Sequence, residues 1–216
     1  MASKIGLSLR LTQEKKYSEE RDALAHDWYE FMAENLPEVS WILMPNIGPR
    51  IFSYIKSWNI DGFILTGGND LGESLLRDET EKHILEFALA NKFPAFGVCR
   101  GMQMIQHYFG GELKAHADAS HIAKNHFIKL VASHLIPQNI NKKYEVNSFH
   151  NFGVKKADLA AGLEALALTR DGLWIEALAH SNEKVAGIQW HPERKGIDPQ
   201  LSCQIIRKFF GLEKGN

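Results

Sequence analysis

The sequence predicts an α/β fold in which helices cover both faces of a mostly parallel sheet. Strand and helix patterns alternate four times in the first half of the chain. The strands there are almost continuously apolar, which is typical of parallel strands buried on both faces. The second half contains strands separated by turns, with no clear helix before the last segment. This change of pattern predicts antiparallel additions to the sheet.

The first half supplies the alternation. Strands are predicted, in order, over Lys4–Leu9, Trp41–Met44, Gly62–Leu65 and Ala95–Val98. Helices are predicted between and after them over Glu19–Asn35, Ile51–Trp58, Asp78–Lys92 and Met102–Phe109. In the first helix, Trp28 and Phe31 belong to an apolar set spaced near the helical period. Ser18 is its expected N-cap, and the acidic residues after it suit the positive end of the helix dipole.

The second half predicts further strands and one closing helix. The strands are expected over Phe127–Val131, Tyr144–Phe149, Ala165–Thr169, Leu173–His180 and Val185–Trp190. Gln200–Phe210 has apolar residues on one face and predicts the helix. In open sheets of this kind, ligands bind beyond the carboxyl ends of the parallel strands. The loops after Leu9, Leu65 and Val98 are therefore the first place to look for a site.

Composition excludes several classes of protein. The 216 residues carry 25 Lys and Arg against 26 Asp and Glu, a formal net charge of −1, which disfavours a dedicated nucleic-acid binder. No apolar run approaches the roughly 18–20 residues of a membrane helix, and no signal-peptide pattern is present. Two cysteines are too few for a disulfide framework and fit a reducing compartment. We therefore expect a soluble cytoplasmic protein that binds neither membrane nor nucleic acid.

The segment from Phe96 to Gln103 is the most informative in the chain. A strand ends at Val98, the pattern Gly97-Val98-Cys99-Arg100-Gly101 follows, and a helix begins at once. The glycines leave room for a tight elbow with Cys99 at its tip. A helix N-terminus favours thiolate over thiol. An isolated cysteine is usually a small buried hydrophobe, but this setting favours a nucleophile.

A nucleophile for acyl transfer needs N–H donors for the oxyanion that forms. The backbone N–H of Arg100 directly follows Cys99 and is one predicted donor. The loop Thr66-Gly67-Gly68-Asn69-Asp70 follows another strand, and its unobstructed Gly68 is the second. Taken alone, this loop would be a simple turn.

A cysteine nucleophile also needs a base that a third group orients. His191-Pro192-Glu193 offers both, because residues two apart in extended backbone point the same way and Pro192 keeps the segment extended. We therefore expect Glu193 beside His191. Alone, the tripeptide would be a surface turn. The order nucleophile, His, acid differs from that of α/β-hydrolase esterases.

Four segments together resemble the class I glutamine amidotransferases, and within them the γ-glutamyl hydrolases. They are Thr66–Asp70, Gly97–Gln103, Val146–His150 and Gln189–Glu193. The resemblance runs from about Ile5 to Phe210, so it implies one domain over residues 1–216 with a flavodoxin-like three-layer αβα sandwich. It implies a triad of Cys99, His191 and Glu193, with oxyanion donors at Gly68 and Arg100. It also implies a substrate pocket formed by Gly67, Asn69, Gln103, Ser148, Phe149, His150 and Asn151.

One feature of the pocket departs from the γ-aminobutyrate type of γ-glutamyl hydrolase. Those enzymes show His-His-Gln after the serine, whereas Phe149-His150-Asn151 follows Ser148 here. The N-terminal stretch is instead similar to γ-glutamyl-CDP-amidate hydrolases, which act in making phosphoramidate decorations of surface polysaccharides. The implied reaction passes through a γ-glutamyl thioester and releases glutamate and an amidate. A γ-aminobutyrate-type hydrolase and a glutaminase subunit that feeds ammonia to a synthase remain alternatives.

Basic residues after the first strand suit an anionic leaving group. Arg10 and Arg21 are candidate contacts for a nucleotide diphosphate, with Lys15 and Lys16 between them. Neighbouring acidic residues neutralise this run, so a solvated surface is the competing interpretation. Tyr17 could stack on a base, whereas Trp28 is expected in the core.

We expect no metal and no cofactor. His116, His121, His126 and His134 match no zinc spacing, and no cysteine lies among them. The expected partner is a small γ-glutamyl substrate, and the sequence does not fix the oligomeric state, for which a homodimer is one candidate. A binding module that kept the fold without activity is a further alternative.

Overall fold

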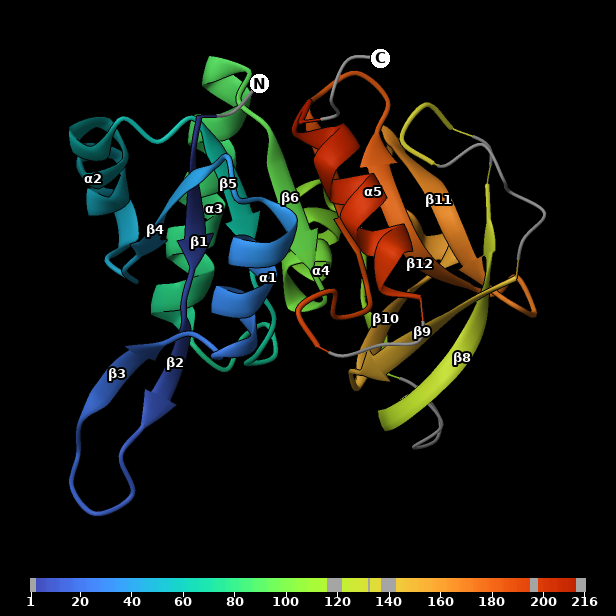
Figure 1. The fold of residues 1–216 in the computed structure, drawn as a ribbon. Helices are drawn as coiled ribbons and strands as arrows, with labels where there is room; N and C mark the ends of the chain where they lie inside the picture. Colours follow the sequence, from blue (N-terminus) through green and yellow to red (C-terminus); the bar gives the residue numbers. More distant parts are fainter. Residues whose placement is uncertain (1–2, 116–121, 132, 137–142, 195–197, 213–216) are drawn as a thin grey trace.

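A mixed sheet runs through the protein, of which the computed structural model describes residues 3–115, 122–131, 133–136, 143–194 and 198–212. Five parallel strands form one half of the sheet, seen as the left and centre of Figure 1. In spatial order they are β4 (Ser40–Met44), β1 (Lys4–Ser8), β5 (Gly62–Leu65), β6 (Ala95–Val98) and β13 (Val185–Ile188).

The other half of the sheet is antiparallel. Beyond β13 come β12 (Trp174–His180), β11 (Leu163–Thr169), β8 (Ile122–Leu130) and β9 (Tyr144–Phe149). The short β10 (Phe152–Lys155) pairs with β12 and with β7 (Lys114–Ala115). The predicted α/β sheet with antiparallel additions is confirmed. β13, which the sequence grouped with those additions, instead lies parallel to β6.

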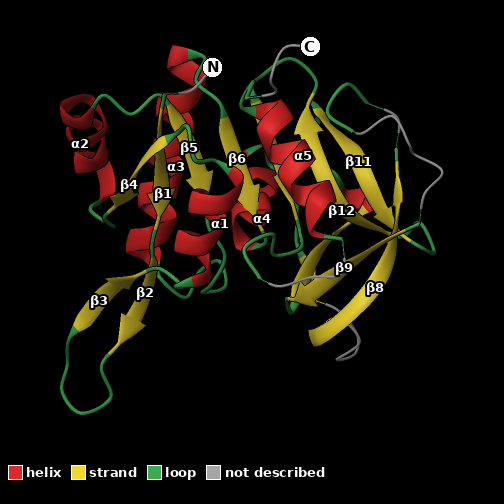
Figure 2. Cartoon of the chain, viewed as in Figure 1, coloured by secondary structure: helices red, strands yellow, loops and turns green. Residues whose placement is uncertain are grey.

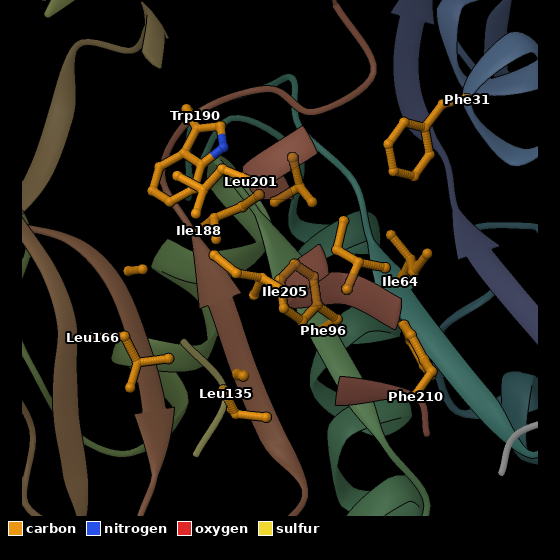
Figure 3. Packing of buried hydrophobic residues seen from close by; sticks show 14 of the residues in the cluster. Phe31, Ile64, Phe96, Leu135, Leu166, Ile188, Trp190, Leu201, Ile205 and Phe210 are labelled. Carbon is orange, nitrogen blue, oxygen red and sulfur yellow. The ribbon is translucent and has the colours of Figure 1, made fainter. Parts of the chain in front are cut away.

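Helices cover both faces of the parallel half (Figures 1 and 2). α1 (Asp27–Asn35) and α5 (Pro199–Phe209) pack on one face, while α2 (Ile51–Trp58), α3 (Leu75–Asn91) and α4 (Arg100–Tyr108) pack on the other. Short 3-10 turns occupy Gly48–Arg50 and Lys156–Asp158. Figure 3 shows Ile205 of α5 beside Phe96 of β6, within the core cluster of the first face. Alternate residues of each parallel strand face the two sides of the sheet, which explains their continuous apolar sequences.

The segment after β1 differs from the prediction. The helix expected from Glu19 begins only at Asp27, and a separate hairpin of β2 (Arg10–Gln13) and β3 (Glu20–Ala23) precedes it. His26, not Ser18, occupies the N-cap position of α1. The buried apolar residues of α1 start at Trp28, and Glu20–Ala23 before it is largely exposed, so no buried apolar face selects a helix there. The hairpin extends away from the sheet in Figure 1.

Parallel pairing brings four strand ends to one edge of the sheet. β1 leads into the hairpin, β5 into Thr66–Gly68, β6 into Cys99, and β13 into the segment that contains His191. The ladder between β6 and β13 continues past the strands, since the Cys99 N–H donates to the Ile188 carbonyl at 2.8 Å. This one backbone contact places the predicted nucleophile next to the strand that carries the predicted base.

Candidate active site

Cys99 sits on a sharp turn between β6 and α4. Its φ of +53° and ψ of −107° lie outside the regions that most non-glycine residues adopt, and it caps α4. The two flanking glycines explain how the turn closes. A methyl group added at Gly97 would lie 2.4 Å from the carbonyl carbon of Gly101, and one at Gly101 would lie 2.1 Å from the Leu65 oxygen. Only glycine lets the elbow pack this tightly against the end of β5.

The loop after β5 lies across from the elbow. A methyl group added at Gly67 would lie 2.8 Å from His191 Cε1 and 3.5 Å from Cys99 Cβ. Gly68 follows with a φ of +90°, in the region that favours glycine. The loop therefore borders both the predicted nucleophile and the predicted base, where an oxyanion donor is needed.

His191 and Glu193 form the contact expected from their spacing. Glu193 Oε1 lies 2.7 Å from His191 Nδ1, and both side chains are almost fully buried. This contact leaves Nε2 as the nitrogen available for proton transfer. The Phe149 ring packs edge-on against the imidazole, with centroids 5.7 Å apart. The carboxylate and the aromatic ring together restrict how the imidazole can turn.

The electrostatics of His191 depend on Cys99. Burial disfavours the imidazolium, but the charge of a Cys99 thiolate and its contact with the ring, reinforced by Glu193, outweigh burial and raise the pKa of His191 to about 10. Nε2 of His191 makes no regular hydrogen bond to any described residue, so the attraction to Cys99 acts through charge and proximity. The raised pKa favours the imidazolium form of His191 at neutral pH, beside the predicted nucleophile.

Two buried side-chain amides, which were not among the predicted site residues, form hydrogen bonds to the predicted base and nucleophile. Asn147 of β9 donates through Nδ2 to the His191 carbonyl at 2.9 Å and accepts from the His191 N–H at 2.8 Å. Gln189 Nε2 donates to Cys99 Sγ at 3.7 Å. Both residues lie inside segments that carried the family resemblance, but their partners are 44 and 90 residues away. Only the fold reveals these contacts.

A polar cavity of about 270 Å³ opens over Cys99 and His191. Besides these two, it is lined by Arg10, Gly68, Asn69, Asp70, Glu73, Arg100, Gln103, Phe149, His150, Asn151 and Arg194. The structure thus brings most of the predicted pocket residues together. Arg194 was not predicted, and its guanidinium lies 4.1 Å from the centre of the Phe149 ring.

The predicted pocket residues differ in their contacts, and Gly67 and Ser148 are not among the residues that line the cavity. Ser148 is fully buried, and Gly67 touches the site only through its backbone. Gln103 donates to the Phe152 carbonyl at 2.8 Å and faces Gln189. The side-chain amide of Asn69 accepts a hydrogen bond from the Leu11 N–H at 2.9 Å and donates one to the Leu11 carbonyl at 3.1 Å. Asn69 therefore fastens the hairpin to the loop of Gly68.

The structure does not bring Arg21 to the cavity, contrary to expectation. Its guanidinium bonds to Glu19 at 2.5 Å, Glu14 at 3.4 Å and the Tyr17 hydroxyl at 2.8 Å, all on the hairpin. Tyr17 is exposed and Trp28 is in the core. Arg10 is different, because its guanidinium reaches over Gly68, within 3.1 Å of where a Cβ would stand. The two arginines of one hairpin thus have separate environments.

The described residues offer neither a metal site nor a membrane span. Among them, no group of three His, Cys, Asp or Glu side chains is arranged to hold a metal ion, and no helix has the length and apolar character to cross a bilayer. His116 and His121 lie outside the described residues. His126 pairs with the buried Glu176 at 3.2 Å.

Comparison with known proteins adds to the geometry. The peptidase C26 family model matches residues 5–193. The chain is 36% identical to a γ-glutamyl-CDP-amidate hydrolase of Campylobacter jejuni over 97% of this chain and 98% of that protein. It is 30% identical to a glutamine-hydrolysing GMP synthase subunit of Methanocaldococcus jannaschii over 79% of this chain and 83% of that protein. A solved Thermoplasma acidophilum structure, described as a candidate GMP synthase subunit, superimposes with a TM-score of 0.72 at 19% identity. The superposition covers 98% of this chain and 94% of that one.

The family match and the fold agree. The match spans nearly all of the sheet and ends at Glu193, the last residue of the predicted triad. The structural neighbour shares the flavodoxin-like architecture across almost the whole chain. The chain therefore belongs to the peptidase C26 family, has the class I glutamine amidotransferase-like fold, and is a hydrolase.

Proposed function

We propose that the protein hydrolyses a γ-glutamyl amide bond, with γ-glutamyl-CDP-amidate as its substrate. The observation that carries the proposal is the buried Cys99 at the strained elbow, facing a His191 that Glu193 holds at 2.7 Å. A thiolate, an imidazolium and an orienting carboxylate are the groups that cysteine-dependent acyl transfer requires.

The proposed reaction has two steps. The Cys99 thiolate attacks the γ-carbonyl carbon, and the backbone N–H groups of Gly68 and Arg100 bind the oxyanion. His191 gives its Nε2 proton to the leaving nitrogen, the C–N bond breaks, and a γ-glutamyl thioester remains. His191 then takes a proton from water, which attacks the thioester carbonyl, so that glutamate leaves and the thiolate returns. Gln189, as a donor to Cys99 Sγ, stabilises the sulfur while it carries charge.

The choice of leaving group has separate support. The near full-length similarity to a γ-glutamyl-CDP-amidate hydrolase favours it. Arg10 and Arg194 both line the cavity beside the nucleophile, where cations suit a diphosphate. A glutaminase subunit serving a separate synthase is the second candidate, favoured by the similarity to the GMP synthase subunit.

A substrate panel with matched cysteine variants tests the proposal. Glutamate release is measured from γ-glutamyl-CDP-amidate, γ-glutamyl-γ-aminobutyrate and glutamine. We expect the first to have the highest kcat/KM, Cys99→Ala to abolish turnover, and Cys203→Ala, which removes the half-buried cysteine of α5, to retain it. Turnover by Cys99→Ala would refute the nucleophile, and a preference for glutamine would favour the glutaminase.

A further inference from the structure

An ionic cluster lies beneath the loop that holds Gly68. It consists of Arg77, Asp78 and Glu81 on α3 and the side chain of Arg100 on α4. Arg77, Glu81 and Arg100 are almost completely inaccessible to solvent. Arg100 binds both Asp78 and Glu81, and Arg77 Nε donates to Glu81 at 3.0 Å. The formal charges of the two arginines and the two carboxylates balance.

Arg77 makes an unusual set of contacts with the loop. Its guanidinium donates to the carbonyl of Thr66 at 2.7 Å, to that of Gly67 at 3.2 Å, and to that of Gly68. Three successive carbonyls therefore point toward one side chain. A planar guanidinium with five donors can bind several acceptors at once, whereas a lysine ammonium cannot match that geometry.

These contacts decide where the Gly68 N–H points. The Gly67 carbonyl and the Gly68 N–H belong to one peptide unit, which is planar and trans, so they point in opposite directions. Because Arg77 holds the carbonyl on its own side, the N–H is directed to the other side of the loop. The cavity over Cys99, which Gly68 lines, is where a donor is required.

Glu81 connects this loop to the second oxyanion donor. One carboxylate oxygen accepts from Arg77 Nε and from the Ser8 hydroxyl at 2.8 Å, and the other accepts from the Arg100 guanidinium. The Ser8 hydroxyl in turn accepts the Thr66 N–H at 2.9 Å. Arg100 supplies the other predicted oxyanion N–H from its backbone. A single buried carboxylate thus joins the supports of both donors.

The two arginines of the cluster keep their protons near neutral pH. Burial lowers the pKa of Arg77 to about 10 and that of Arg100 to about 9, partly offset by neighbouring carboxylates including Asp78. Both arginines therefore remain cationic under ordinary assay conditions.

We propose that Arg77 is a positioning residue for the hydrolysis, which directs the Gly68 N–H toward the oxyanion, and that Glu81 ties this support to Arg100. The inference rests on the proposed function, because it concerns an oxyanion that forms only during acyl transfer. Arg77 itself does not touch the substrate.

Two reactions of the same cysteine separate positioning from general damage. Hydrolysis of a γ-glutamyl amide forms an oxyanion, whereas alkylation of Cys99 by iodoacetamide is a displacement at carbon that forms none. We expect Arg77→Lys to lower kcat by about 100-fold, the lower end of the effect of losing one oxyanion donor. KM and the alkylation rate constant should change by less than about threefold, because the ground-state contacts and the thiolate remain.

Arg207→Lys is the matched control. Arg207 of α5 also binds backbone carbonyls, those of Asn35 at 2.7 Å and Leu212 at 2.6 Å, but it lies outside the residues that line the site. We expect its kcat to stay within about threefold of wild type. If Arg77→Lys does not fold, Glu81→Gln tests the same support and should show the same split between hydrolysis and alkylation.

The outcomes distinguish the two proposals. A wild-type protein that hydrolyses no γ-glutamyl amide overturns the proposed function and this inference with it. An active wild type whose Arg77→Lys variant keeps its kcat, or loses kcat and alkylation rate in parallel, overturns the inference alone. Parallel loss would show that the cluster only maintains the fold around Cys99.

Discussion

Asn147 holds the backbone of the predicted base, and its removal has a calculable cost. Asn147 is 5% exposed, and its side chain makes two hydrogen bonds, at 2.8 and 2.9 Å, to the N–H and the carbonyl of His191. Asn147→Ala leaves both backbone groups buried without these partners. A buried polar group that loses its partner costs about 1–3 kcal/mol, so two such groups predict a loss of about 2–6 kcal/mol in the free energy of unfolding.

Catalysis should suffer as well. This amide anchors the His191 backbone to β9, so its loss lets the imidazole shift relative to Cys99, and a displacement near 1 Å lowers rates by about 100-fold. Urea denaturation measures the stability loss, and glutamate release from a γ-glutamyl amide measures kcat. Asn35→Ala is the control, because its amide donates to the Phe31 carbonyl at 3.0 Å within α1, on an element that does not carry His191. The reasoning is refuted if Asn147→Ala loses less than about 1 kcal/mol and keeps its kcat.

Two further predictions concern charged side chains. Arg10→Ala should raise the KM for γ-glutamyl-CDP-amidate by about tenfold or more and leave the KM for γ-glutamyl-γ-aminobutyrate little changed. Arg21→Ala should leave both KM values unchanged, because of the two arginines only Arg10 lines the cavity. Equal effects of the two variants would contradict this assignment. Burial lowers the pKa of His126, but Glu176 outweighs it and the net pKa is raised. The pairing therefore stabilises the fold below about pH 6.5 and loses this contribution as pH rises through the raised pKa. The stability difference between wild type and His126→Gln in urea unfolding should be larger at about pH 6 than at about pH 9, and a constant difference would speak against the ion pair.

The elements that the sequence predicted well are those whose burial is local and regular. The helix over Ile51–Trp58 and the strands over Gly62–Leu65, Ala95–Val98 and Tyr144–Phe149 have the predicted bounds. Each strand has a dense apolar or alternating pattern whose apolar side chains are buried only when the segment is extended. The sequence of the segment itself was therefore enough to predict these strands.

The hairpin shows where that reasoning ends. Glu20–Ala23 is charged and exposed, so no apolar period selects helix or strand there. Its conformation comes from pairing with Arg10–Gln13 and from contacts outside itself. Asp22, for example, accepts from the Asn46 side chain at 2.6 Å, 24 residues along the chain. A partner so distant leaves no signal in the segment's own sequence.

For the site, the sequence by itself determined the elbow, because Gly97, Cys99 and Gly101 lie within five residues and together require a tight turn. It also predicted the contact between His191 and Glu193, because their spacing of two residues places both side chains on one side of an extended segment. Only the tertiary structure decided that β13 lies parallel to β6, which brings the predicted base to the predicted nucleophile 92 residues earlier in the chain. It alone revealed Asn147 and Gln189 as supports and separated Arg10 from Arg21. The physical reason is range. Steric limits and periodicity act between near neighbours, whereas strand order and buried polar pairing depend on which distant surfaces the whole chain can bury together.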